Sequence, residues 1–131
     1  MVISNLRDCA GDLFRLRESM THTVFICTTC AEIGGMPKGA ALIEDVTARL
    51  AHLGDFKVRG QECLSACDKP TALAFRADGK AAYLFLGVDA DKDGVDVAAF
   101  AMMYKDALNG WIEDARPAGR LRFCLAGRIP A

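Results

Sequence analysis

The order of hydrophobic positions along the chain predicts alternating strands and helices. Residues 23–26 form a β-branched and aromatic run, and residues 56–59 alternate apolar and polar side chains, so both segments are predicted strands. The segment between them carries an apolar stripe at helical spacing and ends at a glycine, which predicts a helix over residues 38–53. A strand, a helix and a second strand in this order favour a right-handed crossover with parallel strands.

The following segments predict a hairpin and a second helix. Residues 71–75 and 81–86 flank Asp78-Gly79, a dipeptide favoured in the tight turn between two antiparallel strands. From Asp96 onwards, apolar residues again recur at helical spacing until the Asn109-Gly110 pair. We also expect a short amphipathic helix over residues 5–18.

These elements together predict an α/β fold. We expect a thioredoxin-like sandwich with a mixed four-stranded sheet, in which an antiparallel hairpin extends two parallel strands, and with two main helices. The chain has 131 residues, the size of one domain. We therefore expect a single domain over residues 1–131, with its core over residues 22–111 and short terminal extensions over residues 1–21 and 112–131.

The charge balance bears on the partners of the protein, and the hydrophobic pattern of the N-terminal region bears on its location in the cell. Sixteen Lys and Arg residues against 17 Asp and Glu residues leave a net charge of −1, so nothing favours binding to nucleic acid or to an anionic membrane. Charges interrupt the N-terminal region where a signal peptide needs an apolar stretch, and no uncharged apolar run reaches the roughly 18 residues of a membrane span. We expect a cytoplasmic protein.

Six cysteines are the unusual part of the composition. In a reducing compartment, clustered cysteines are more often metal ligands or catalytic thiols than disulfides. Four of them form two pairs, Cys27 with Cys30 and Cys63 with Cys67, and each pair follows a predicted strand. Since the carboxyl ends of parallel strands meet at one edge of a sheet, the pairs are expected to converge. Four thiolates form a soft, roughly tetrahedral ligand set, which selects zinc or an iron–sulfur cluster over hard cations.

Two other chemistries compete with an iron–sulfur cluster. A structural zinc site is one, because Cys-x-x-Cys is the habitual spacing of zinc ligands. Thiol–disulfide exchange is the other, but its active cysteine pair should open a helix, and here Gly34-Gly35-Met36-Pro37 delays the predicted helix. Exchange also leaves Cys63 and Cys67 without a role.

The remaining cysteines and an acidic run have simpler interpretations. Cys9 and Cys124 lie in the terminal extensions and are expected to be small buried residues, although Cys9 stays an alternative ligand in place of Cys30. Residues 89–94 look like the start of an EF-hand calcium loop, but the twelfth position, which needs a bidentate acid, is Phe100. We interpret this run as a loop that caps the second predicted helix.

The segment Cys63-Leu64-Ser65-Ala66-Cys67, with Pro70 close by, resembles the cysteine segment of thioredoxin-like [2Fe–2S] ferredoxins and of the small iron–sulfur subunit of respiratory NADH dehydrogenase. The full pattern, including Cys27-Thr28-Thr29-Cys30 and the hairpin with Asp78-Gly79-Lys80, is closer to a bacterial family of predicted metal-binding proteins, DUF1636. The resemblance covers roughly residues 22–111. The two-residue gap of the first pair departs from the wider gap of the ferredoxins, so a mononuclear ion stays an alternative.

The resemblance implies that Cys27, Cys30, Cys63 and Cys67 ligate a [2Fe–2S] cluster in a one-electron carrier that is not itself an enzyme. Its partner would be a redox protein, a reductase or oxidoreductase, with corrinoid or tetrapyrrole metabolism as the context. A homodimer is expected on the same ground. Lys38, Arg59 and Lys69 are candidates to offset the negative charge of the cluster.

Overall fold

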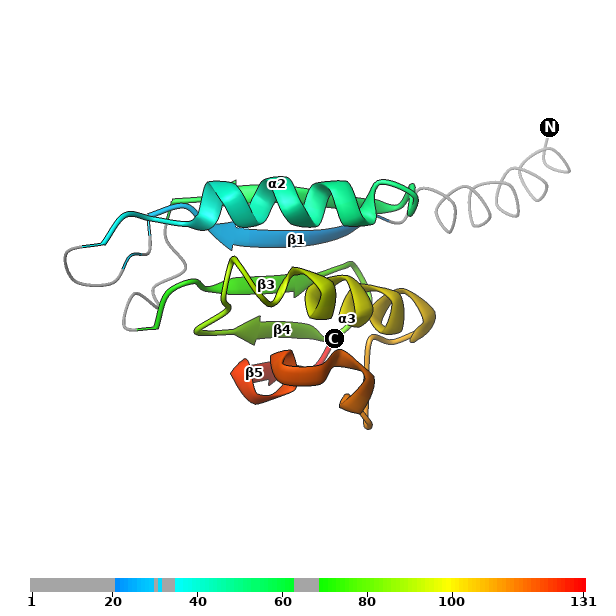
Figure 1. The fold of residues 1–131 in the computed structure, drawn as a ribbon. Coiled ribbons are helices and arrows are strands. Elements are labelled where there is room, and N and C mark those ends of the chain that lie inside the picture. The colour runs from blue at the N-terminus through cyan, green and yellow to red at the C-terminus, as the bar shows by residue number, and fades with distance from the viewer. Residues whose placement is uncertain (1–20, 30, 32–34, 63–68) are drawn as a thin grey trace, which may run out of the picture.

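The computed structural model describes residues 21–29, 31, 35–62 and 69–131, and in them three helices pack on a five-stranded sheet (Figure 1). The strands are β1 (His22–Cys27), β2 (Phe56–Gln61), β3 (Leu73–Arg76), β4 (Ala82–Phe85) and β5 (Leu125–Ile129). The helices are α2 (Gly39–Leu50), α3 (Gly94–Asp106) and the 3-10 helix η1 (Arg116–Cys124). The helix predicted over residues 5–18 lies outside the described residues.

The sheet is mixed, with the strand order β2-β1-β3-β4-β5. Strand β1 pairs with β2 in parallel and with β3 in antiparallel, and β3, β4 and β5 continue the sheet antiparallel. The predicted parallel pair and hairpin are therefore confirmed. The register of the parallel pair places Cys27 opposite Gln61 at the carboxyl end of both strands.

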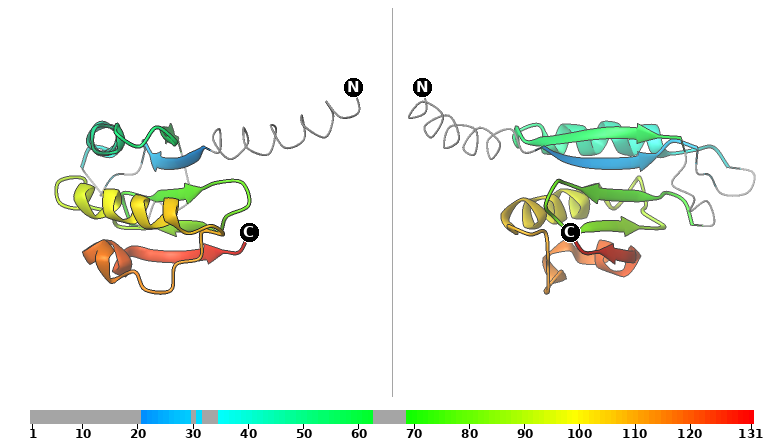
Figure 2. Two further views of the ribbon diagram at one scale, coloured as in Figure 1. Left: turned by 90° about the vertical axis from the view of Figure 1, so that its right-hand side faces the viewer. Right: turned by 180° about the vertical axis from the view of Figure 1, so that it is seen from behind.

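The helices α2, α3 and η1 cover the same face of the sheet (Figure 2). Helix α2 buries the stripe of Leu42, Val46 and Leu50 that the helical spacing predicts. An aromatic cluster fills the space between α3 and the hairpin, with ring centroids 4.9–6.4 Å apart; its members are Phe75, Tyr83, Phe85, Phe100 and Tyr104. These contacts form the centre of the hydrophobic core.

The prediction of a four-stranded sheet with a terminal extension over residues 112–131 is wrong. This segment supplies helix η1 and the edge strand β5, which pairs with β4. The side chains that η1 buries, Ala118, Leu121 and Cys124, recur every three residues. Gly119, at φ 59° and ψ −132°, interrupts the helix and separates Ala118 from the other two, so the segment consists of two short turns without one continuous helical period.

A buried lysine anchors the end of the sheet opposite to Cys27. The Lys80 ammonium group donates to the carbonyls of Tyr104 and Lys105 at the C-terminus of α3, at 2.8 and 3.1 Å, and it lies 2.8 Å from His22 Nε2. On its other side, the His22 ring contacts the Asp55 carbonyl through Nδ1 at 3.2 Å. The ring is therefore neutral, with Nδ1 donating and Nε2 accepting. Burial lowers the pKa of His22, and the Lys80 ammonium lowers it further.

The N-terminus of α2 lies directly against the end of β1. A Cβ atom added to Gly39 would overlap the carbonyl oxygen of Cys27 and would approach Thr28 Cα to 3.0 Å. Only glycine allows this approach without a shift of the backbone. The contact fixes where α2 begins relative to Cys27.

We expect His22 to make stability depend on pH. Its pKa is lowered from the ordinary value of 6.5 in the folded protein, so the unfolded chain takes up a proton first as the pH falls. The His22 contribution is complete above pH 6.5 and is lost as the pH falls towards the folded-state pKa. Urea unfolding between about pH 8 and about pH 5 should therefore show a smaller loss of stability in His22→Gln than in the wild type, because glutamine accepts from Lys80 without titrating. The control His52→Gln, at an exposed site, should lose stability as the wild type does; a wild-type pH dependence in His22→Gln would contradict this account.

We expect Gly39→Ala to lower the free energy of unfolding by about 1–3 kcal/mol, the usual cost of inserting a methyl group into a filled site. The matched control is Gly54→Ala, since a Cβ atom there meets no atom within 4 Å. Its effect should stay below about 1 kcal/mol. Chemical denaturation of the two variants checks this, and equal effects would mean that the contact between α2 and β1 is not tight.

Candidate metal site

Cys27 is the one predicted ligand whose position the structure describes. It is the last residue of β1 and is fully buried, beside Ala72 and Leu86. Its thiol lies 3.6 Å from the carbonyl oxygen of Glu62, which immediately precedes Cys63, and 3.7 Å from Thr29 Oγ1. Cys30, Cys63 and Cys67 lie outside the described residues.

The two chain segments that lead into the cysteine pairs are joined to each other. The backbone N–H of Thr28 donates to the carbonyl oxygen of Gln61 at 2.8 Å, and the Thr28 hydroxyl donates to the same oxygen at 3.3 Å. The Thr29 hydroxyl donates to the carbonyl oxygen of Glu62. The parallel pairing of β1 and β2 thus continues beyond the strands, up to the residue before Cys63. Sequence reasoning placed the cysteine pairs at one edge but did not assign these threonines a role.

The N-terminus of α2 adds an electrostatic element to this edge. The first turn of the helix contains no acidic residue, and no side chain caps its free N–H groups. The positive end of the helix dipole is therefore not neutralised locally, and Gly39 brings it against the Cys27 backbone. The contact is with the Cys27 carbonyl group and Thr28 Cα, so the helix terminus lies beside the backbone of the predicted ligand. In the sequence, this contact is marked only by a glycine at the start of the predicted helix. A glycine at that position does not by itself indicate a close contact.

The basic residues expected near the site occupy three different places. Lys38 precedes α2 and lies 3.4 Å from Asp91, with both side chains largely exposed. Arg59 is an exposed residue of β2, two positions before Gln61. Lys69 is exposed in the connection that leads to β3. The structure therefore does not gather these charges into one cluster.

Cys124 packs in the core, as expected for a small buried residue. It is 9% exposed, and its thiol lies 3.7 Å from the carbonyl oxygen of Gly87 and 3.9 Å from that of Arg120. Burial raises the pKa of this thiol, which keeps it protonated. Cys9, the alternative ligand, lies outside the described residues.

The acidic run of residues 89–94 is a closed loop held by its own hydrogen bonds. Asp89 accepts from the Asp91 amide at 2.8 Å, and Asp93 accepts from the Asp89 amide at 2.7 Å. The Arg120 guanidinium holds the Asp93 carboxylate through bonds of 2.7 and 3.0 Å. Asp93 is the N-cap residue of α3, yet its side chain does not bond to the helix amides. Over the described part of the chain, no group of three or more His, Cys, Asp or Glu residues could hold a metal ion.

None of the helices in the ranges that the structure describes is long and apolar enough to cross a membrane.

Comparison with known proteins gives a family assignment. No curated protein and no solved structure matches the chain. A family model described as "Protein of unknown function (DUF1636)" matches residues 24–131, which include most of β1, the cysteine pairs, the hairpin, η1 and β5. The match continues past residue 111, where the sequence resemblance ends, and it includes the terminal segment that completes the sheet. The chain belongs to the DUF1636 family.

Proposed function

We propose that this protein is a small ferredoxin-like electron carrier whose [2Fe–2S] cluster is held by Cys27, Cys30, Cys63 and Cys67. The observation that carries the proposal is the joining of the two cysteine-bearing segments at one edge of the sheet by Thr28 and Thr29. A cysteine set supplied by two adjacent segments is the arrangement that a four-thiolate site needs. When bound, the cluster supplies a one-electron redox couple, and the protein around it sets the potential.

The described residues fit an anionic sulfur-ligated group. Cys27 is buried at the end of β1, so its thiolate would be shielded from solvent. The unneutralised N-terminus of α2 beside it would stabilise negative charge on that thiolate. Burial and positive charge act on the potential in opposite directions, because burial disfavours the extra negative charge of the reduced state and the helix terminus favours it.

The strand order supports a thioredoxin-like fold. The β2-β1-β3-β4 part of the sheet contains the parallel pair and the antiparallel hairpin that the ferredoxin resemblance implies. We propose that β5 is an addition of this family to that arrangement, placed at the edge of the sheet opposite to β2.

A structural zinc site is the second candidate. The two-residue gap between Cys27 and Cys30 favours it, because Cys-x-x-Cys is the habitual zinc spacing. The same four cysteines would then hold a redox-inert ion, and the protein would carry no electrons.

Thiol–disulfide exchange is the third candidate function. The helix terminus at the end of β1 favours it, and the burial of Cys27 argues against it. The helix terminus beside Cys27 is the feature that activates a redox thiol. Cys27 is completely buried, however, whereas an attacking thiol needs access to its substrate. We therefore rank this activity below metal binding.

An electron carrier of this kind would meet its redox partner at the edge where β1 and β2 end. Contacts between electron-transfer proteins are small, often below about 1,200 Å² of total buried surface, so the edge and its loops suffice for docking. A reductase or oxidoreductase, in corrinoid or tetrapyrrole metabolism, is the partner class we propose.

The test is the content of iron, zinc and acid-labile sulfide in protein purified without oxygen. We expect about two irons and about two sulfides per chain, with a visible spectrum that bleaches on reduction. Stoichiometric zinc without sulfide would replace the ferredoxin proposal by the zinc site. Protein that contains neither iron nor zinc but forms a reversible disulfide between Cys27 and Cys30 would favour thiol–disulfide exchange.

We expect Cys27→Ser to abolish cluster incorporation and Cys124→Ser to leave the visible spectrum unchanged. The two form a matched pair, since both remove a thiol that is at most 9% exposed, but only Cys27 lies at the end of β1. Substitution of Cys63 or Cys67 should act as Cys27→Ser does, and Cys9→Ser should be silent. If Cys9→Ser loses the visible spectrum and Cys30→Ser keeps it, the proposed set of four cysteine ligands is wrong.

A further inference from the structure

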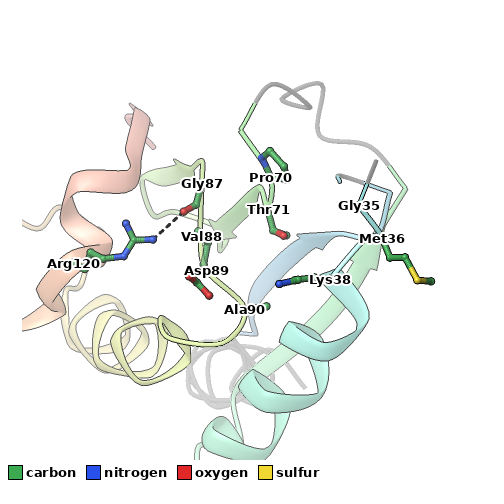
Figure 3. A pocket seen from close by; sticks show the side chains of 10 residues that line it. All are labelled: Gly35, Met36, Lys38, Pro70, Thr71, Gly87, Val88, Asp89, Ala90 and Arg120. Carbon is green, nitrogen blue, oxygen red and sulfur yellow. Dashed lines mark hydrogen bonds between the residues drawn. The ribbon is translucent and has the colours of Figure 1, made fainter. Parts of the chain in front are cut away.

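A pocket of about 200 Å³ opens between the start of α2, the segment before β3 and the loop between β4 and α3. Lys38 and Thr71 line it from two walls, and Gly87, Asp89 and Arg120 line the rest (Figure 3). The volume equals about seven water molecules at roughly 30 Å³ each. It is below the roughly 300–1,000 Å³ of sites for drug-sized ligands, so it suits a small molecule.

Most of the hydrogen-bonding capacity of the acidic wall is already used. Asp89 accepts from the amide of Asp91, which turns its carboxylate towards its own loop. Arg120 is held by both oxygens of Asp93 and by the carbonyl oxygen of Gly87, at 2.7–3.1 Å. The Arg120 charge offsets that of Asp93, and the Arg120 Nη1 group makes no hydrogen bond to another residue that the structure describes, so it is a further donor on this side.

The opposite walls offer donors that are not satisfied. Thr71 is 4% exposed, and its backbone pairs with Val88. Its hydroxyl points into the pocket and makes no hydrogen bond with another residue that the structure describes (Figure 3). Because this hydroxyl is not among the buried unsatisfied atoms, it is open to the pocket and free to bond to a ligand. The Lys38 side chain points into the same space, and its contact with Asp91 at 3.4 Å is exposed and weak.

The helix that follows Lys38 begins beside the pocket, although its own residues do not line it. The amides of residues 39–41, in the first turn of α2, have no acceptor within the helix, whose first such bond runs from the Leu42 amide to the Lys38 carbonyl. The donors that face the pocket from Thr71 and Lys38 suit an acceptor-rich, negatively charged ligand.

We propose that this pocket binds the oxyanion group of a small molecule, a phosphate or a carboxylate, between the Thr71 hydroxyl and the Lys38 ammonium group. Both protein groups donate, Lys38 adds the charge, and the positive end of α2 reinforces it. The site does not depend on the metal assignment, because it uses none of the cysteines.

The test is calorimetric titration of the purified full-length protein in a chloride buffer of constant ionic strength. Inorganic phosphate and succinate are titrated separately. Saturable binding of one ligand per chain is expected for at least one of them, and the one that binds more tightly identifies the source of the oxyanion.

Variants locate the binding. Thr71→Val keeps the shape of the side chain and removes only the hydroxyl, and Lys38→Gln removes only the charge; each should raise the Kd about tenfold, the value of one lost hydrogen bond or charge contact. Thr71→Ser keeps the hydroxyl and should bind as the wild type does. Lys92→Gln is the charge control, since Lys92 is exposed further along the loop between β4 and α3 and does not line the pocket.

Melting temperatures show whether a variant has lost the fold rather than the ligand. Thr71→Val should keep its melting temperature without ligand, because the hydroxyl has no partner among the described residues to lose. Absence of saturable binding of both anions up to about 10 mM, an affinity too weak for a built site, would overturn the proposal. Unchanged binding in both Lys38→Gln and a folded Thr71→Val would overturn it as well.

Discussion

The parallel pairing of β1 with β2 is the constraint on which the rest of this structure depends. It places Cys27 beside Gln61 and brings the next residues of both chains into hydrogen-bond contact. A parallel pair needs a crossover connection, and α2 is that connection, so the helix must return across the face of β1. Gly39 lets the helix begin against the Cys27 carbonyl. The strand pairing therefore positions the cysteine, the positive end of the helix and the wall of the adjacent pocket together.

The opposite end of the sheet is held by polar contacts rather than by a turn alone. Lys80 follows the β3–β4 turn and caps the last carbonyls of α3, while His22 at the start of β1 accepts its third hydrogen bond. An ammonium group that is 6% exposed is tolerable only because all three of its protons are used. These bonds tie together β1, the hairpin and α3, in addition to the pairing of β1 with β3 and the bond from the Tyr104 hydroxyl to the Ala81 carbonyl.

Periodic burial explains what could be predicted from the sequence. The α2 stripe, the alternation in β2 and the Asp78-Gly79 turn each reflect one local rule, and the structure contains all three elements. Helix η1 and β5 were missed because short 3-10 turns interrupted at Gly119 and a short glycine-containing edge strand give no strong local signal. Burial of Lys80 and the unpartnered Thr71 hydroxyl depend on contacts between distant segments, which a single sequence does not reveal. The convergence of two cysteine-bearing segments was predictable in outline, and the threonine bonds that join them were not.

The anchoring of this fold at the Lys80 end has an evolutionary consequence. The side chains that lock the sheet, the hairpin and α3 together lie at the end away from Cys27. Changes in loop length at the cysteine end cost little entropy as long as these anchors are kept, because loop closure depends only weakly on length. Members of the family can therefore differ in the loops at this end of the sheet while the scaffold stays the same. Divergence within the family should then be concentrated between β1 and α2 and between β2 and β3.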